Sequence, residues 1–146
     1  MVMTNPILES FLTLRRTFAA PRDRVFHAWT DARAIERWFK PAGNPSAVTA
    51  LDLRVGGGYC IEVRFPEGDI TTIAGTYVEI ARPEKLVFTW QSELTDDHET
   101  LVTLDFVARA AVTEVILTHA RFTTEDMRDR HQFGWTYMLD EMRNLF

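Results

Sequence analysis

Hydrophobic positions near the end of the chain recur with the period of an α-helix. Bulky side chains stand three or four residues apart at Met127, His131, Trp135, Met138, Met142 and Leu145. Charged residues fall mostly between them, and Thr123 precedes Glu125 and Asp126, as expected of an N-terminal cap followed by acidic residues in the first turn. The pattern predicts one continuous amphipathic helix over residues 123–145. It also predicts that Gly134, which is costly inside a helix, is kept for the close approach of another element.

Upstream of this helix, apolar and polar residues mostly alternate, which is typical of half-buried strands. The predicted strands are 11–18, 48–54, 59–65, 70–80, 86–91, 101–108 and 112–121. Most of the connections are short, which favours antiparallel neighbours because parallel strands need longer crossovers. Two short helical stripes interrupt the strands after the first one. One starts at Pro21 and contains Trp29, and the other is capped by Asp31 and contains Trp38.

The order of these elements predicts an α+β fold of the helix-grip kind. A curved antiparallel sheet of six to seven strands wraps around the long C-terminal helix, with two short helices after strand 1. Because a straight helix cannot touch a curved sheet everywhere, we expect a cavity between them, plugged at one end by the short helices. We expect one domain over residues 1–146, with residues 1–10 as an N-terminal extension.

Composition supports an apolar interior and narrows the class of protein. Of the 146 residues 46% are hydrophobic, and they include ten Phe, four Trp and three Tyr. No apolar run approaches the ~20 residues of a membrane span, and the N-terminus lacks the pattern of a signal peptide, so we expect a cytoplasmic protein. A net charge of −5 with dispersed basic residues argues against nucleic acid as a partner.

No catalytic or metal-binding motif can be identified. The glycines at 56–58 lack the Lys-Ser/Thr pair of a phosphate loop, and the four histidines lack the spacing of metal ligands. The lone Cys60 excludes an internal disulfide, and nothing marks it as a nucleophile. We therefore assign no catalytic residue, no metal and no cofactor.

Three polar residues nevertheless stand at apolar positions of their elements. These are Arg16, His119 and His131, and each is either satisfied locally or positioned to orient a ligand inside an apolar cavity. Arg16 in particular needs an acidic partner or an opening to water.

The candidate ligand-binding residues are those that the predicted sheet and helix turn toward a common space. They are Trp38, Tyr59, Ile61, Val63, Phe65, Tyr77, Phe88, Trp90, Leu117, His119, Trp135, Met138 and Met142. Aromatic and thioether groups adapt to irregular apolar shapes, so we expect this cavity to accept hydrophobic ligands. Tyr59 and His119 are the polar members expected to orient a ligand through a hydrogen bond.

Several phrases of the sequence also resemble a known family. Residues 18–21 (FAAP), 25–31 (VFHAWTD) and 38–41 (WFKP) resemble the opening of START-like, birch-allergen-type helix-grip (SRPBCC) proteins. Further phrases resemble the family homologous to the activator of the heat-shock-90 ATPase: 75–80 (GTYVEI), 82–86 (RPEKL), 88–90 (FTW), 117–119 (LTH) and 134–135 (GW). The resemblance covers residues 11–146. It implies the fold derived above. The relatives that it indicates bind hydrophobic molecules or act as cyclases or hydrolases.

Three functions follow as hypotheses. The first is binding of a small hydrophobic or amphipathic molecule between the long helix and the sheet. The second is a cyclase- or hydrolase-type enzyme acting on such a molecule, with His119 or Arg16 in an acid–base or anion-stabilising role. The third is a co-chaperone-like interaction module, although the eukaryotic co-chaperones of the family carry an additional domain for which 146 residues leave no room. A homodimer is left open.

Overall fold

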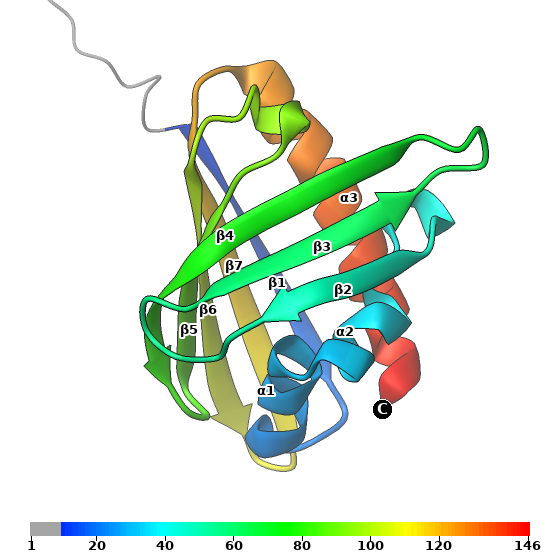
Figure 1. Ribbon diagram of the computed structural model, residues 1–146. Coiled ribbons are helices and arrows are strands. Elements are labelled where there is room, and N and C mark those ends of the chain that lie inside the picture. The colour runs from blue at the N-terminus through cyan, green and yellow to red at the C-terminus, as the bar shows by residue number, and fades with distance from the viewer. Residues whose placement is uncertain (1–9) are drawn as a thin grey trace, which may run out of the picture.

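The computed structural model describes residues 10–146, so of the expected N-terminal extension at 1–10 all but Ser10 lies outside the described residues (Figure 1). The elements in chain order are β1 (Ser10–Phe18), α1 (Arg22–Thr30), α2 (Ala32–Trp38), the 3₁₀ helix η2 (Pro41–Gly43), β2 (Ser46–Leu51), β3 (Gly58–Arg64), β4 (Ile70–Ala81), β5 (Lys85–Trp90), η3 (Glu93–Thr95), β6 (Thr100–Arg109), β7 (Val112–Phe122), α3 (Glu125–Met142) and η4 (Arg143–Leu145).

The strands form one antiparallel sheet of seven in the order β1-β7-β6-β5-β4-β3-β2. Irregular register between Tyr77 and Glu79, and between Val48 and Ala50, bends the part of the sheet that contains β2 to β4. The sheet thereby curves around α3, while α1 and α2 lie at one end of it (Figure 1). The predicted α+β helix-grip architecture is confirmed.

Helix α3 is continuous through Gly134, and η4 extends it with a tighter last turn. Two details of its prediction were wrong. The hydroxyl of Thr124, and not that of Thr123, caps the helix by accepting a hydrogen bond from the Met127 backbone N–H at 3.1 Å. A Cβ added to Gly134 would meet no atom within 4 Å, so no element approaches this glycine closely.

The second predicted strand is also shorter than expected. β2 ends at Leu51, three residues before the predicted end at Arg54. The chain turns here because the Arg54 backbone N–H donates to the Asp52 carbonyl at 2.8 Å, while the Asp52 N–H makes the last bond to β3, at 2.9 Å from the Gly58 carbonyl. β2 also begins two residues before the predicted start, at Ser46, and the bounds of the other six strands agree with the predicted ones to within one residue at each end.

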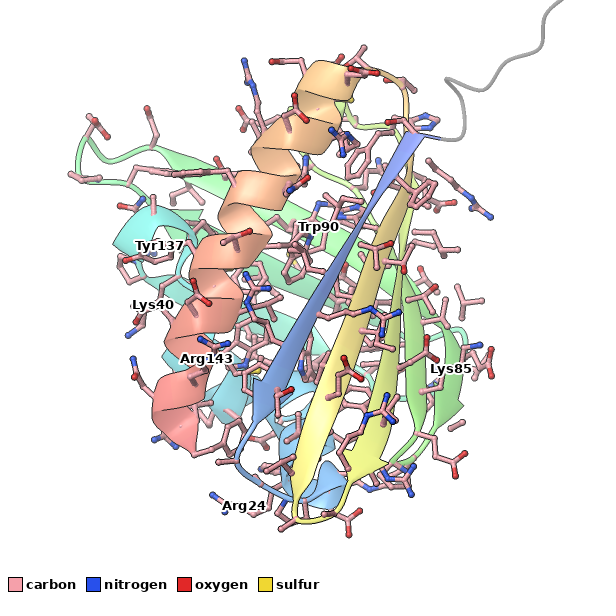
Figure 2. All side chains as sticks on the ribbon, turned by 180° about the vertical axis from the view of Figure 1, so that it is seen from behind. Arg24, Lys40, Lys85, Trp90, Tyr137 and Arg143 are labelled. Atoms are coloured by element: carbon pink, nitrogen blue, oxygen red, sulfur yellow. The ribbon has the colours of Figure 1, made fainter. Side chains whose placement is uncertain are left out.

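Two interactions fix the elements that surround the interior. Trp38 is 1% exposed, as predicted for an end plug, and its indole N–H donates to the Ala28 carbonyl at 2.8 Å. Arg16 has the acidic partner that its position requires, because its Nε donates to the Asp140 carboxylate at 3.2 Å and so joins β1 to α3. Seen from behind in Figure 2, these two elements lie side by side, with Trp90 in the space between helix and sheet.

Candidate functional site

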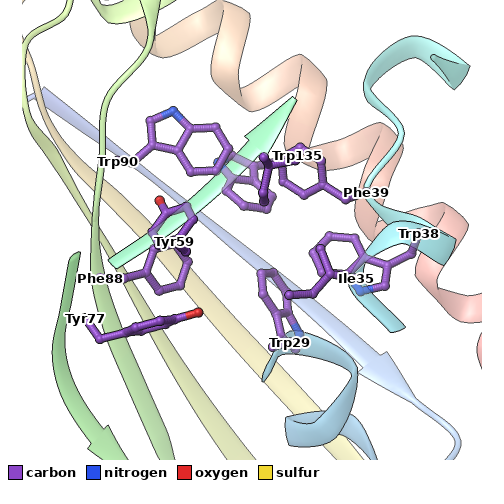
Figure 3. Close-up of a pocket in the computed structure, with 10 residues that line it drawn as sticks. Trp29, Ile35, Trp38, Phe39, Tyr59, Tyr77, Phe88, Trp90 and Trp135 are labelled. Carbon is purple, nitrogen blue, oxygen red and sulfur yellow. The ribbon is translucent and has the colours of Figure 1, made fainter. Parts of the chain in front are cut away.

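An aromatic cavity lies between the short helices, the sheet and α3 (Figure 3). We call it the aromatic chamber. It is lined by Trp29, Ile35, Trp38, Phe39, Tyr59, Ile61, Tyr77, Phe88, Trp90 and Trp135. Its volume is about 30 Å³, which is room for about two water molecules. Helices α1 and α2 supply one wall and strands β3 to β5 supply the other.

A second chamber of about 70 Å³ adjoins the first one, under the middle of α3. Its lining residues are Phe39, Pro41, Ile73, Trp90, Ser92, Leu94, Arg130, His131, Gly134, Trp135 and Met138. Three residues line both chambers and form what we call the partition: Phe39, Trp90 and Trp135. Their ring centroids are 5.0 to 6.4 Å apart, which is the normal range for packed aromatic side chains.

The structure brings many of the candidate ligand-binding residues together. Those in the aromatic chamber are Trp38, Tyr59, Ile61, Tyr77, Phe88, Trp90 and Trp135, and Met138 lines the second chamber. Others are buried in the core but line neither chamber, namely Val63, Leu117, His119 and Met142. Phe65 is half-buried at a shallow hollow beside Glu67 and Asp69.

Some lining residues were not among the candidates. Trp29, Ile35 and Phe39 line the aromatic chamber, although the sequence pattern placed Trp29 only on the apolar stripe of the first short helix. His131 lines the second chamber, so of the three polar residues at apolar positions it is the one that faces a cavity. The sequence signal that could have identified these lining residues is the high number of aromatic residues in and beside the short helices, since two of them are enough to plug one end of the cavity.

The two tyrosines of the aromatic chamber differ in how their hydroxyl groups are used. Tyr59 donates to the Thr89 carbonyl at 2.6 Å. The two groups can meet because residue 75 is glycine, since a side chain there would collide with both Tyr59 and Thr89. The Tyr77 hydroxyl makes no hydrogen bond within residues 10–146, although Tyr77 is 4% exposed. Burial raises the pKa of Tyr77 to about 12, so the group is a neutral donor at physiological pH.

Tyr77, and not Tyr59, is therefore the tyrosine with a free hydroxyl group. Figure 3 shows this hydroxyl directed across the chamber toward Trp29. Burial, with Tyr77 and Cys60 nearby, also raises the pKa of Tyr59 well above its usual value.

His119 is the centre of a buried chain of hydrogen bonds, which we call the His119 network. The Trp135 indole N–H can only donate, and it donates to His119 Nδ1 at 3.0 Å. The opposite ring nitrogen, Nε2, therefore carries the proton and donates to the Thr100 hydroxyl at 2.7 Å. That hydroxyl in turn donates to the Trp90 carbonyl at 2.7 Å. Both nitrogens of His119 are thus engaged within the protein, and neither is free to orient a ligand.

Burial and the neighbouring His131 ring lower the pKa of His119 well below its usual value. The His119 imidazole is consequently neutral at physiological pH. Because this ring is fully buried, its network holds Trp135 in place as a wall of both chambers.

His131 has a different arrangement. Its Nδ1 donates to the Met127 carbonyl at 2.8 Å, so Nε2 carries a lone pair, and no group in residues 10–146 donates to it. Burial lowers the pKa of His131, and the bond to the Met127 carbonyl partly opposes that shift. The second chamber therefore contains a neutral imidazole with one free acceptor.

Two indole N–H groups at the chambers also lack partners. The Nε1 atoms of Trp29 and Trp90 are buried and make no hydrogen bond within the described part of the chain. An unsatisfied buried donor costs about 1–3 kcal/mol, so each of the two requires an explanation. Both belong to residues that line the aromatic chamber.

Within residues 10–146 no group of three His, Cys, Asp or Glu side chains is arranged to hold a metal ion. None of the described helices is long and apolar enough to cross a membrane.

Comparison with known proteins gives one family and many similar folds. The family model described as "Activator of Hsp90 ATPase homolog 1-like protein" matches residues 19–146. Protein CV1439 from Chromobacterium violaceum is similar at 24% identity and a TM-score of 0.84, over 92% of this chain and 95% of that chain. The AHSA1 protein from Silicibacter pomeroyi is similar at 25% identity and a TM-score of 0.79, over 92% and 96%.

CalU16 from Micromonospora echinospora is similar at 26% identity and a TM-score of 0.70, over 92% of this chain and 74% of that chain. No curated protein matches the chain.

Proposed function

The chain belongs to the Activator of Hsp90 ATPase homolog 1-like family, and on that premise we propose that it binds a small hydrophobic or amphipathic molecule between α3 and the sheet. Family and fold together support a ligand-binding or co-chaperone-like module. The observation that favours ligand binding is the unpaired Tyr77 hydroxyl inside an otherwise aromatic chamber, together with the unpaired Trp29 N–H. A ligand with an oxygen or nitrogen acceptor would satisfy these donors while its apolar part replaces water.

The volume of the chamber sets a condition on this proposal. A cavity that binds benzene measures about 150 Å³, whereas the aromatic chamber measures about 30 Å³. A ring-sized ligand therefore requires a side chain to move. Phe39 is the partition residue that the His119 network does not hold, so we expect its rotation to join the two chambers when a ligand enters.

The direct test compares two ligands that differ in one polar group, 2-naphthol and 2-methylnaphthalene. Binding is measured by quenching of tryptophan fluorescence, since Trp29, Trp90 and Trp135 all line the chamber. Tyr77→Phe should weaken 2-naphthol about five- to tenfold, the worth of one buried hydrogen bond, and leave 2-methylnaphthalene unchanged. Tyr137→Phe, at a partly exposed tyrosine on α3, is the matched control.

A second variant tests the location without relying on a hydrogen bond. Ile61→Phe adds volume to the wall of the aromatic chamber and should weaken both naphthalenes at least tenfold while thermal unfolding remains cooperative. If Tyr77→Phe and Ile61→Phe both bind the two compounds as the wild type does, the ligand does not occupy this chamber and the proposal fails.

The enzymatic alternative receives no support from its candidate residues. Both nitrogens of His119 are engaged in the His119 network, and Arg16 pairs with Asp140 and lines neither chamber. The co-chaperone alternative rests on family membership alone.

A further inference from the structure

The second chamber differs from the aromatic chamber in the polar groups that it offers. Its lining includes one cationic side chain, Arg130, and one imidazole, His131, but no carboxylate. Arg130 is occupied only by a surface ion pair with Asp126 at 3.1 Å, in which both side chains are more than half exposed. Such exposed pairs are worth little, so Arg130 is available to another anion at the rim of the chamber.

A donor without a partner stands next to this space. Trp90 belongs to the partition, is 5% exposed, and its Nε1 has no acceptor. Figure 3 shows this nitrogen on the edge of the ring that is turned away from Tyr59 and Phe88, and therefore away from the floor of the aromatic chamber. The second chamber is the remaining cavity that Trp90 lines.

Beside this donor is an acceptor without a partner, His131 Nε2. The two rings are packed edge to face with centroids 6.1 Å apart. A single ligand group that both accepts and supplies a proton would satisfy the two residues together. A hydroxyl group and a carboxylic acid can each do so, but only the acid also carries the charge that Arg130 attracts once its proton is shared with His131.

We infer that the second chamber holds the head group of a hydrophobic carboxylic acid whose apolar body occupies the aromatic chamber. This inference rests on the proposed function and specifies the ligand class. One carboxyl oxygen accepts from the Trp90 N–H. Because a free carboxylic acid is ionised at neutral pH, a proton is taken up from solvent on binding, and it lies between the other oxygen and His131 Nε2. Arg130 lies at the rim of the second chamber and attracts the charge of the carboxyl group. The partition surrounds the point at which the apolar body of the ligand joins its carboxyl group.

The charges around His131 are compatible with this assignment. The other titratable group against its ring is His119 of β7, at a centroid distance of 5.2 Å, and both nitrogens of His119 are engaged within the protein. On α3 the charged group that lines the same chamber is Arg130, and the remaining rings against His131 are those of Trp90 and Phe122. An acid brings the only negative charge into this lining.

The experiment compares 2-naphthoic acid, 2-naphthylmethanol and 2-methylnaphthalene by isothermal titration calorimetry at one fixed pH. We expect the acid to bind about tenfold more tightly than the alcohol, because a charge-assisted hydrogen bond replaces a neutral one. His131→Asn keeps a donor for the Met127 carbonyl but removes the Nε2 acceptor, and it should abolish that preference. Arg130→Gln should weaken only the acid, about three- to tenfold, and Arg128→Gln, two residues away on α3 and outside the chamber, should not.

A spectroscopic measurement keeps the test independent of variant stability. In protein labelled with ¹⁵N at histidine, the His131 Nε2 resonance should move toward that of a protonated nitrogen when 2-naphthoic acid binds and stay in place when 2-methylnaphthalene binds. If the acid binds no more tightly than the hydrocarbon, or His131 Nε2 does not respond, the head-group assignment is wrong while hydrophobic binding stands. If none of the three compounds binds, the proposed function fails and the assignment fails with it.

Discussion

Acidification should destabilise this protein through the His119 network before its carboxylates begin to protonate. His119 is neutral in the folded state, where its pKa lies well below the usual value, but it has an ordinary pKa near 6.5 once the chain unfolds. Between these two values the unfolded state binds more protons than the folded state. Stability conferred by the neutral ring is therefore complete above about pH 6.5 and is lost progressively as the pH falls below it.

The size of the effect follows from one proton. Between pH 7.5 and 5.5, a histidine that stays neutral in the folded state and titrates near 6.5 in the unfolded state lowers the free energy of unfolding by about 1.4 kcal/mol. His131, whose pKa is lowered as well, adds at most about the same amount. We expect a total loss of about 1.4–2.7 kcal/mol over this interval.

The assay is urea denaturation followed by tryptophan fluorescence at several pH values. His119→Gln keeps a donor for the Thr100 hydroxyl but cannot be protonated, so it should be less stable than the wild type at pH 7.5 and lose about 1.4 kcal/mol less on acidification. His98→Gln, at an exposed histidine in the β5–β6 connection, is the matched control. Equal pH dependence in the wild type and His119→Gln would show that His119 is not held neutral by the network, and the reasoning would be refuted.

Three further predictions concern stability, each measured by urea denaturation. Gly134→Ala should raise the free energy of unfolding by about 0.5–1 kcal/mol, because the new methyl group meets open space and alanine favours the helix; a loss would mean that an unseen contact fills that space. Trp38→Ala should cost about 3–5 kcal/mol, and a cost below about 1 kcal/mol would contradict its role as a buried plug. Thr124→Ala should cost about 1 kcal/mol and Thr123→Ala clearly less, with the reverse order assigning the cap to Thr123.

The fold could be predicted from the sequence because the buried face of each helix or strand requires hydrophobic residues at regular intervals along the chain. The alternation in residues 59–65 and the three- and four-residue spacing of Met127, His131 and Trp135 each specify one buried face. Where a turn depends on backbone hydrogen bonds, as at Arg54, this regular spacing ends and the predicted boundary was wrong by three residues.

The site was only partly predictable, because an apolar stripe is the same whether its residues fill a core or line a cavity. Trp29 was for this reason left out of the candidate ligand-binding residues, although it lines the aromatic chamber. The hydrogen bonds of the His119 ring could not be predicted from the sequence, since its two partners, Thr100 and Trp135, lie 19 and 16 residues away on other elements. Gly134 was misjudged because sequence shows that a side chain is missing but not whether a neighbour needs the space.

The His119 network determines which part of the wall can admit a ligand. It anchors the middle of α3 through Trp135 to three neighbouring strands, β5, β6 and β7, and the partly exposed pair of Arg16 and Asp140 joins the same helix to β1 nearer its end. Since Trp135 and His119 are both buried, the hydrogen bond between them resists lifting of α3 away from the sheet more than the partly exposed ion pair does. By contrast, no hydrogen bond in the described residues joins η2 to α3, and Phe39 precedes that segment by two residues. If the chambers bind a ligand as proposed, we therefore expect it to enter by way of Phe39 and η2, and substitutions in the connection between α2 and β2 to change its exchange rate.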